Sequence, residues 1–262
     1  MRFKMGNALL AVLVAVAFAG CVTTQAPKPV APDTTFHIAT TPYPQLSGNK
    51  NSYGGWWKDR FEQKAKLAAE GGFDVMFVGD SITHGIDDNR DNDVFEKMLA
   101  PAKIGNFGFS GDRTENVLWR FEHGNLSGKI NPRVIMVMIG SNNTGHRMDT
   151  PEDIADGVAA IVSQLTEKFP SANILLLGIF PRGQDVKDAM RINNDKANEI
   201  IARLDGTANG HVHYLDINAK LLTADGVLSR DIMPDLLHPN AKGYEIWANA
   251  VVPEIKKYLG KG

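Results

Sequence analysis

The chain has 262 residues, enough for one large α/β domain or for two small domains. Hydrophobic residues make up 43% of it and charged residues 22%, a composition typical of a soluble globular protein. A net charge of −2, without a long basic run, gives no electrostatic basis for binding nucleic acid, so we expect no such partner.

The first twenty residues have the pattern of an export signal. Arg2 and Lys4 precede an apolar run over 8–20 that is too short to cross a bilayer as a helix. The run ends at Cys21, the only cysteine, which resembles the lipidated cysteine of a bacterial lipoprotein, although Phe18 stands where leucine is usual. The alternative is a plain secretory signal with an incidental cysteine. We expect an exported lipoprotein, anchored to a membrane by its N-terminal lipid on the periplasmic or cell-surface side, without disulfides.

The chain divides into three predicted segments. Residues 1–20 are the predicted signal peptide. Residues 21–51 are rich in Pro, Thr, Ala and Ser and lack periodic aliphatic residues, which predicts a flexible tether. Residues 52–262 form one predicted folded domain, since neither a repeat nor an internal linker interrupts them. The oligomeric state is not predicted.

Short apolar runs alternate with longer amphipathic stretches in the predicted domain. The predicted strands cover 74–79, 103–107, 133–139, 173–180 and 212–217. The predicted helices cover 91–100, 114–121, 151–169, 188–204 and 241–259. Pro253 is expected to kink or break the last helix. Continuous apolar strands between helices predict a three-layer α/β/α sandwich with a five-stranded parallel sheet.

Polar motifs follow the predicted strands, at the edge where a parallel sheet binds its ligands. Ser81 follows the first strand within Gly-Asp-Ser, where a turn lifts the hydroxyl clear of the backbone. Gly111 follows the second strand and Asn142 the third, while Asp235 and His238 follow the last. A serine nucleophile needs a base, a group that orients the base, and donors for the developing oxyanion.

The motifs therefore predict a triad of Ser81 as nucleophile, His238 as base and Asp235 as orienting carboxylate. The backbone N–H groups of Ser81 and Gly111 and the amide of Asn142 are the predicted oxyanion donors. Structural alternatives exist: Ser81 as a helix N-cap, Asn142 as a turn residue with left-handed φ, Gly111 as part of a tight turn, and Asp235 as a surface carboxylate. The four motifs in their order favour the catalytic interpretation.

Several short segments carry a family resemblance. They are 79–81, 106–108, 111–112, 117–120, 140–143, 177–178, 181–183 and 235–238. Together they resemble the GDSL-type, or SGNH, hydrolase family, near the branch that contains the catalytic subunits of intracellular platelet-activating-factor acetylhydrolase. The resemblance covers about 73–258 and implies a flavodoxin-like fold, the site roles given above, and hydrolysis without metal or cofactor. Asn143 departs from the family, where many members have Asp, and Thr83 excludes the Gly-x-Ser-x-Gly elbow of α/β-hydrolases.

We expect the substrate pocket to be lined by residues near these motifs, namely Ile82, Phe109, His146, Phe180, Arg182 and Leu237. Three other features favour structural roles. Trp56 and Trp57 are interpreted as a packing clamp rather than a sugar platform. The acidic cluster over 87–93 is interpreted as a solvated loop rather than a calcium site. His211 and His213 are interpreted as partly exposed residues at a strand edge, not as metal ligands.

The leading hypothesis is a serine esterase that removes small acyl groups, acetyl foremost, through an acyl-enzyme. Export and tethering favour an acylated carbohydrate or polysaccharide as substrate. A lipid acylhydrolase, a lysophospholipase or a platelet-activating-factor-acetylhydrolase-like activity is the alternative within enzymes. A tethered glycan-binding protein with a degenerate site is the alternative of another class.

Overall fold

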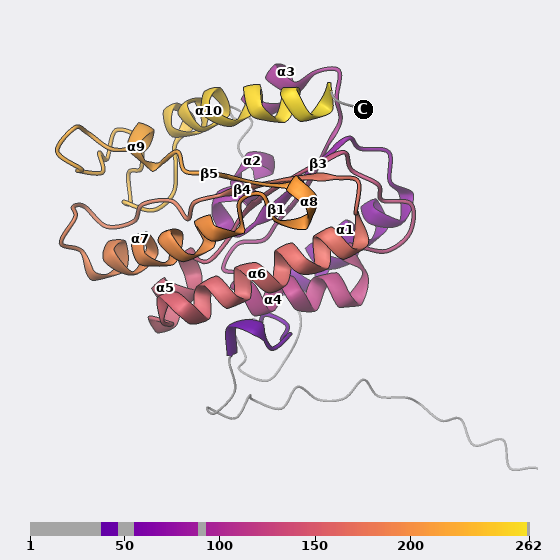
Figure 1. The fold of residues 1–262 in the computed structure, drawn as a ribbon, viewed down its shortest axis with the longest axis horizontal. Coiled ribbons are helices and arrows are strands. Elements are labelled where there is room, and N and C mark those ends of the chain that lie inside the picture. Colours follow the sequence, from indigo (N-terminus) through magenta and orange to yellow (C-terminus); the bar gives the residue numbers. More distant parts are fainter. Residues whose placement is uncertain (1–37, 47–54, 89–92, 261–262) are drawn as a thin grey trace, which may run out of the picture. The chain divides into compact units, whose positions relative to one another are not determined.

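The computed structural model describes residues 38–46, 55–88 and 93–260 (Figure 1). The predicted signal peptide, Cys21 and most of the predicted tether lie outside the described residues. Within the described ranges, no helix combines the length and the hydrophobicity that a membrane span requires.

Residues 38–46, which we call the N-terminal arm, pack against the domain and begin with a short 3₁₀ helix, Ile38–Thr40. The bonds that fix the arm run from Thr114 Oγ1 to the Ala39 carbonyl (2.8 Å), from Asn116 Nδ2 to the Tyr43 carbonyl (2.8 Å) and from the Tyr43 N–H to the Glu115 carbonyl (3.1 Å). The prediction of a flexible tether over 21–51 is wrong for this arm, because side-chain hydrogen bonds satisfy its backbone and hold it in place.

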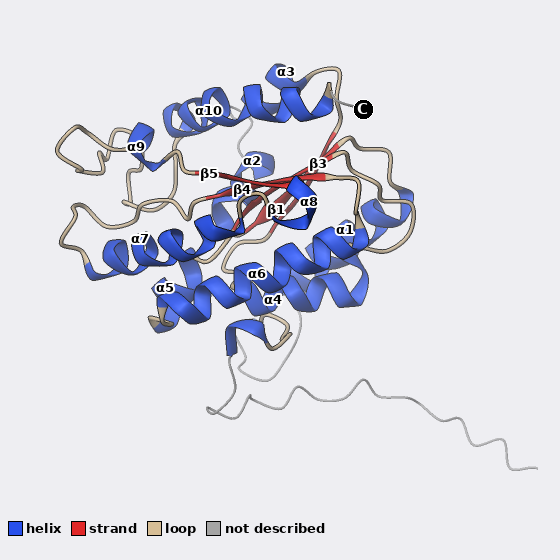
Figure 2. Ribbon diagram, viewed as in Figure 1, coloured by secondary structure: helices blue, strands red, loops and turns tan. Residues whose placement is uncertain are grey.

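Five parallel strands form one sheet in the order β2-β1-β3-β4-β5 (Figure 2). The strands are β1 (Val75–Gly79), β2 (Ile104–Gly108), β3 (Val134–Met138), β4 (Asn173–Leu177) and β5 (Val212–Leu215). This is the flavodoxin-like order, and the direction of chain progression reverses between β1 and β3. The predicted fold class is confirmed. The strand predicted to end at 180 ends at Leu177, where its pairing with β5 also ends.

Helices cover both faces of the sheet. One face carries α2 (Ser81–Asp88), α3 (Val94–Leu99), α9 (Asn218–Leu221) and α10 (Ala241–Leu259), and the other carries α1 (Gly55–Glu70), α4 (Thr114–Arg120), α6 (Pro151–Lys168) and α7 (Ala189–Ile201) (Figure 2). The short helix α5 (Ser141–Arg147) follows β3, and the short helix α8 (Thr207–Gly210) precedes β5. A π-helical turn covers Phe121–Asn125, and a 3₁₀ turn covers Ala202–Leu204.

The observed helices differ from the predicted ones. The sequence did not predict the short helices α2, α5, α8 and α9 or the longer α1, whose buried residues are few among many charged ones. Pro253 does not break α10, which is helical from residue 241 to 259. Pro253 is exposed, while Val251, Val252 and Ile255 are buried, so packing outweighs the one lost backbone bond.

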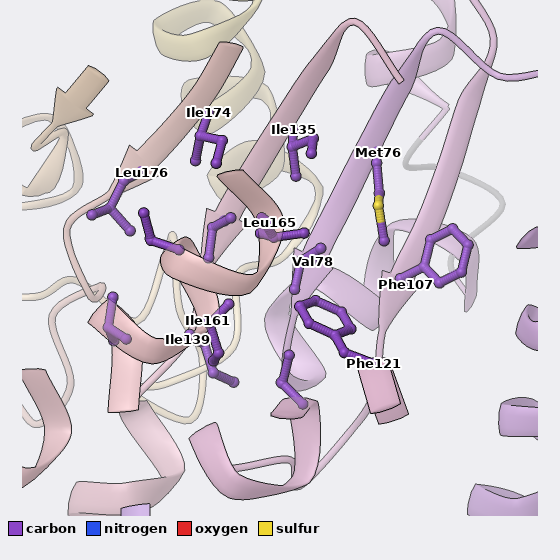
Figure 3. Packing of buried hydrophobic residues seen from close by; sticks show 14 of the residues in the cluster. Met76, Val78, Phe107, Phe121, Ile135, Ile139, Ile161, Leu165, Ile174 and Leu176 are labelled. Atoms are coloured by element: carbon purple, nitrogen blue, oxygen red, sulfur yellow. The ribbon is translucent and has the colours of Figure 1, made fainter. Parts of the chain in front are cut away.

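Side chains of alternate strand residues pack into two apolar layers, one on each face of the sheet. Figure 3 shows the layer under α6, in which Val78 and Ile135 from the strands approach Ile161 and Leu165 of the helix. Each such side chain contributes about 1.5–3 kcal/mol when fully buried. These layers fix the strand ends, from which the polar motifs project.

Candidate active site

Ser81 is the first residue of α2 and directly follows the Gly79-Asp80 end of β1. Asp80, not Ser81, caps the helix, because Asp80 Oδ1 accepts a hydrogen bond from the Ile82 N–H at 3.0 Å. Ser81 Oγ lies 2.8 Å from His238 Nε2. The alternative in which Ser81 serves only as an N-cap is therefore wrong.

His238 and Asp235 lie in the loop that precedes α10. His238 Nδ1 lies 2.6 Å from Asp235 Oδ2, while Asp235 Oδ1 accepts the backbone N–H groups of Leu237 (3.0 Å) and His238 (2.7 Å). Burial alone would raise the pKa of Asp235, but the hydrogen bonds from His238 and Leu237 outweigh it and lower that pKa. The ionised carboxylate therefore orients the imidazole, and Nε2 is the nitrogen that faces the Ser81 hydroxyl.

Leu236 holds a strained turn between these two residues, with φ at +62°. The left-handed region costs a non-glycine residue about 1–2 kcal/mol, so the loop retains it only because other contacts hold it. The Leu236 N–H donates to the Met233 carbonyl (2.9 Å), and its carbonyl accepts the Gly183 N–H (3.1 Å). The turn at Leu236 lies between Asp235 and His238, whose side chains are in contact at 2.6 Å.

The predicted oxyanion donors come from the loops after β2 and β3. Gly111 has φ at +79°, a conformation that favours glycine, and a Cβ there would lie 2.5 Å from Gln45 Nε2 and would displace that flexible amide. Asn142 lies in the first turn of α5, which rules out the left-handed turn alternative. Its Nδ2 donates to the Asp112 carbonyl at 3.0 Å. Because an amide nitrogen carries two hydrogens, one donor is left for an oxyanion.

A buried ion pair supports the loop that contains Gly111. Asp112 Oδ2 accepts from Arg120 Nε at 2.8 Å, Asp112 Oδ1 accepts from Trp57 Nε1 at 2.6 Å, and the Arg120 guanidinium lies over the Phe109 ring. Burial raises the pKa of Asp112 to about 6, although Arg120 and Trp57 pull it down. The carboxylate is still ionised at neutral pH, and it fixes the loop through both oxygens.

Asn143, the departure from the family pattern, links this loop to α5. Its Oδ1 accepts the Thr114 N–H at 3.1 Å, and its Nδ2 donates to Asp149 Oδ2 at 3.0 Å. Glu115 Oε2 lies 3.5 Å from the same nitrogen. An aspartate at this position would keep the first bond but would place a third carboxylate beside two others, so asparagine suits these surroundings.

Helix α2, which begins with Ser81, is held on two sides. On one side it packs so closely on β2 that a Cβ at Gly108 would lie 2.3 Å from the backbone nitrogen of His84. On the other side the Tyr244 hydroxyl of α10 donates to the Ile82 carbonyl at 2.7 Å. The start of α2, where Ser81 lies, is therefore held between the sheet and the last helix.

Asp80, beside Ser81, is fully buried. Burial raises its pKa to about 7, while the hydrogen bond from Ile82 and the charges of His238 and Arg182 oppose this rise. Its Oδ2 has no hydrogen-bond partner among the described residues. Asp80 is therefore only partly ionised at neutral pH.

The predicted pocket residues have two different environments. Ile82, Phe109 and Phe180 are at most 1% exposed and belong to the core, so the prediction that they line a substrate pocket is wrong. An apolar side chain next to a motif has the same sequence pattern whether it faces the core or a cavity. The other three are accessible, namely His146, Arg182 and Leu237.

Two of these accessible residues lie near one another. Arg182 donates to the Ser141 carbonyl at 2.6 Å, and Arg113 Nη1 lies 3.1 Å from His146 Nδ1. Burial, together with the positive charges of Arg113, Arg182 and Arg147, lowers the pKa of His146. The imidazole of His146 is thus held neutral in a basic environment.

The remaining features of the sequence have structural roles in the described residues. Asp87 pairs with Arg60 (2.9 Å) and Lys64 (3.1 Å) rather than facing solvent alone, so the solvated-loop interpretation is wrong for it. His213 stacks on Tyr258 at 4.1 Å between ring centroids. In the described ranges, no three acidic, histidine or cysteine side chains are grouped as metal ligands.

One contributor to the site was missed in the sequence. Gln45 of the N-terminal arm places its amide against Gly111, and its Oε1 is buried without a partner in the described structure. It had no signal beyond its residue type, because the arm lacks periodic apolar residues. The sequence interpretation of Trp57 of α1 as a packing residue does not include its hydrogen bond to Asp112.

Comparison with known proteins places this arrangement in a family. The model of the GDSL-like lipase/acylhydrolase family matches residues 77–246. Platelet-activating factor acetylhydrolase IB subunit alpha1 of Bos taurus is 36% identical over 172 residues, which cover 65% of this chain and 70% of that protein. Subunit alpha2 of the Rattus norvegicus enzyme is 37% identical over 172 residues, covering 65% and 71%.

Solved structures share the fold at low identity. An acetylxylan esterase from Geobacillus stearothermophilus superposes with a TM-score of 0.57 at 19% identity, covering 71% of this chain and 94% of that one. A GDSL-like lipase from Bacteroides thetaiotaomicron gives 0.56 at 19%, covering 75% and 97%. The chain belongs to the GDSL-like lipase/acylhydrolase family and is a carboxylic ester hydrolase of that family.

Proposed function

We propose that the chain is a serine esterase that removes acetyl or similarly small acyl groups from a carbohydrate. The observation that carries the catalytic part is the chain of contacts from Ser81 Oγ to His238 Nε2 (2.8 Å) and from His238 Nδ1 to Asp235 Oδ2 (2.6 Å). The names of the relatives, which include acetylhydrolases and an acetylxylan esterase, support an acetyl ester.

The reaction follows from this geometry in two halves. Ser81 Oγ attacks the ester carbonyl carbon as His238 Nε2 takes its proton, and Asp235 stabilises the imidazolium. The Ser81 N–H, the Gly111 N–H and the second amide hydrogen of Asn142 bind the oxyanion. The alcohol leaves with the proton from His238. Water then attacks the acyl-enzyme with His238 as base, releasing the acid and regenerating the Ser81 hydroxyl.

The experiment is acetate release from acetylated xylan, chitin, sialic acid and a phospholipid, with Ser81→Ala as the inactive control. The proposal is supported if the wild-type protein releases acetate from a glycan and Ser81→Ala does not. Activity confined to phospholipid would replace it with a lipid acylhydrolase, which the platelet-activating-factor relatives favour. In that case, the rate of hydrolysis of p-nitrophenyl esters should rise as the acyl chain lengthens from acetyl to octanoyl.

The alternative of a glycan-binding protein with a degenerate site needs a site that does not react. The triad contacts weigh against it, because all three side chains are in hydrogen-bond reach. A fluorophosphonate probe tests it directly, since failure to label Ser81 would favour binding without catalysis.

We also propose that the protein is exported and anchored through a lipid on Cys21. The support is the sequence pattern of residues 1–21, and no described residue bears on it. Metabolic labelling with a fatty-acid analogue and membrane fractionation, compared with Cys21→Ala, test the proposal. Label that persists in Cys21→Ala would contradict it.

A further inference from the structure

Two adjacent tryptophans begin α1 in opposite environments. Trp57 is 1% exposed, donates to Asp112 Oδ1 at 2.6 Å and packs against Phe109. Trp56 is 47% exposed. The buried ring therefore fixes the first turn of the helix to the loop after β2, and the same turn presents the other ring at the surface. Their predicted interpretation as a packing clamp fits Trp57 but not Trp56.

The exposed ring lies against the wall of the candidate site. Trp56 stacks on His84 with 5.8 Å between ring centroids and 26° between ring planes. His84 is on α2, one turn after Ser81, and its Nδ1 lies 2.9 Å from the Ser110 hydroxyl. The Ser110 N–H also approaches this nitrogen at 3.2 Å. Ser110 directly precedes Gly111, so one imidazole separates the Trp56 ring from the oxyanion loop.

The surroundings of Trp56 are polar. Arg60, one turn further along α1, donates to the Gly108 carbonyl at 2.8 Å and to Asp87 at 2.9 Å. The other large hydrophobic residues that are exposed in the described ranges come from segments after β3 and β4: Met148, Val186 and Ile192. A lipid chain needs a continuous apolar surface, and a single ring with charged neighbours does not provide one.

We propose that Trp56 is a stacking platform for a sugar ring of the substrate. This inference rests on the proposed function, in which the alcohol half of the ester is a carbohydrate. One face of a pyranose is lined by C–H groups and its rim by hydroxyls, so it packs flat on an indole while polar neighbours meet the hydroxyls. His84 stacks on the Trp56 ring, which is still 47% exposed.

The position suits recognition of the alcohol rather than chemistry. His84 connects Trp56 to Ser110, the residue before Gly111, so we place the sugar on the Trp56 side of the acyl group. Trp56 precedes residues 77–246, which the family model matches, so the platform adds a glycan contact outside that matched segment.

The experiment compares kcat and KM of the full chain on p-nitrophenyl acetate and on acetylated xylo-oligosaccharides. The variants are Trp56→Ala, Trp56→Phe and, as a matched control on the exposed part of the same helix, Lys66→Ala. We expect Trp56→Ala to lower the ratio of kcat/KM for the sugar ester to that for p-nitrophenyl acetate about tenfold, mainly through KM. In Trp56→Phe the ratio should fall between those of Trp56→Ala and the wild type, and in Lys66→Ala it should equal the wild-type ratio.

An unchanged ratio in Trp56→Ala overturns the inference. An equal loss on both esters also overturns it, because Trp56 would then act only by supporting His84 and the oxyanion loop. Calorimetric titration of Ser81→Ala, with and without Trp56→Ala, against unacetylated xylo- and chito-oligosaccharides separates this test from the esterase test. If neither ester is hydrolysed, the proposed esterase function fails. Glycan binding that requires Trp56 would still support the stacking platform. Glycan binding that is absent, or that does not depend on Trp56, would contradict the platform.

Discussion

The two halves of the candidate site are built differently. The oxyanion half is buried: Asp112 and Arg120 are inaccessible, and Asn142 is 7% exposed. The base half is open, with the His238 and Asp235 side chains 43% and 55% exposed, and it is held by a short loop with one strained residue. Preorganised donors need a rigid, dry support, whereas a base must exchange protons with substrate and water.

This contrast predicts where each half is vulnerable. Changes in the oxyanion half should affect the fold as well as the rate, since its side chains belong to a buried network. Changes in the base half should affect the rate alone, because few other groups depend on the loop side chains. The following predictions run from the largest expected effect to the smallest.

Ser81→Ala removes the residue at which the two halves meet. We expect kcat on p-nitrophenyl acetate to fall about 10⁵-fold, because no nucleophile is left. Steady-state kinetics with melting curves check this. Ser127→Ala, which alters an exposed serine, is the control and should leave both unchanged. More than a tenth of the wild-type activity in Ser81→Ala would mean that another group is the nucleophile.

Asp235→Asn tests the open half. The amide oxygen can keep the bonds from the Leu237 and His238 N–H groups, so the loop should stay folded. The imidazole would lose its anionic partner, and we expect kcat to fall about 10³- to 10⁴-fold with little change in stability. Kinetics paired with urea unfolding measure both. A stability loss as large as that expected for breaking a buried ion pair would contradict the difference between the two halves.

Asp112→Asn tests the buried half. It leaves the Arg120 guanidinium without its counter-charge, and we expect about 3–5 kcal/mol of stability to be lost. Glu62→Gln breaks the exposed pair with Lys58 and should cost far less stability, because water and salt screen an exposed pair. Urea unfolding of the two variants gives the comparison, and equal losses would show that burial of the pair does not matter.

Asn142→Ala removes one oxyanion donor and its bond to the Asp112 carbonyl. We expect kcat to fall about 10²- to 10³-fold, with KM little changed. Asn131→Ala, at an exposed position, is the control for losing an amide. If Asn142→Ala raised only KM, the amide would bind the ground state and would not be an oxyanion donor.

Asp80→Asn should change how stability depends on pH. Because burial raises the pKa of Asp80 from 3.8 to about 7, the folded protein holds a proton that the unfolded chain releases between these values. The wild type therefore loses stability as pH rises from about 4 to 7, and the variant avoids this loss. Melting temperatures at pH 4.5 and 8 should differ by several degrees more in the wild type. Parallel profiles would mean that Asp80 stays ionised.

The parts of the site that are local in sequence could be predicted. Asp235 and His238 are three residues apart, and Ser81 and Asn142 directly follow buried strands whose continuous apolar runs mark a parallel sheet. The triad contacts and the fold then follow from the rule that strand ends share one edge. The catalytic roles themselves stay a prediction until the variants are made.

The parts that depend on packing could not be predicted. Gln45 reaches Gly111 only because the N-terminal arm crosses the domain, and no periodicity marks that path. Phe109 and Phe180 are core residues although they lie beside motifs, since an aromatic side chain fits either a core or a cavity. Trp56 and Trp57 have different environments because consecutive residues of a helix point in different directions.

The hydrogen bond from Tyr244 to Ile82 has a consequence for the order of synthesis. A growing chain emerges from its N-terminus, so β1 and α2 are synthesised well before the loop at 235–238 and helix α10. Until then the chain contains Ser81 but neither His238, the predicted base, nor the Tyr244 hydroxyl that holds the first turn of its helix. We therefore expect a chain that ends before residue 235 to lack esterase activity altogether rather than to hydrolyse esters slowly.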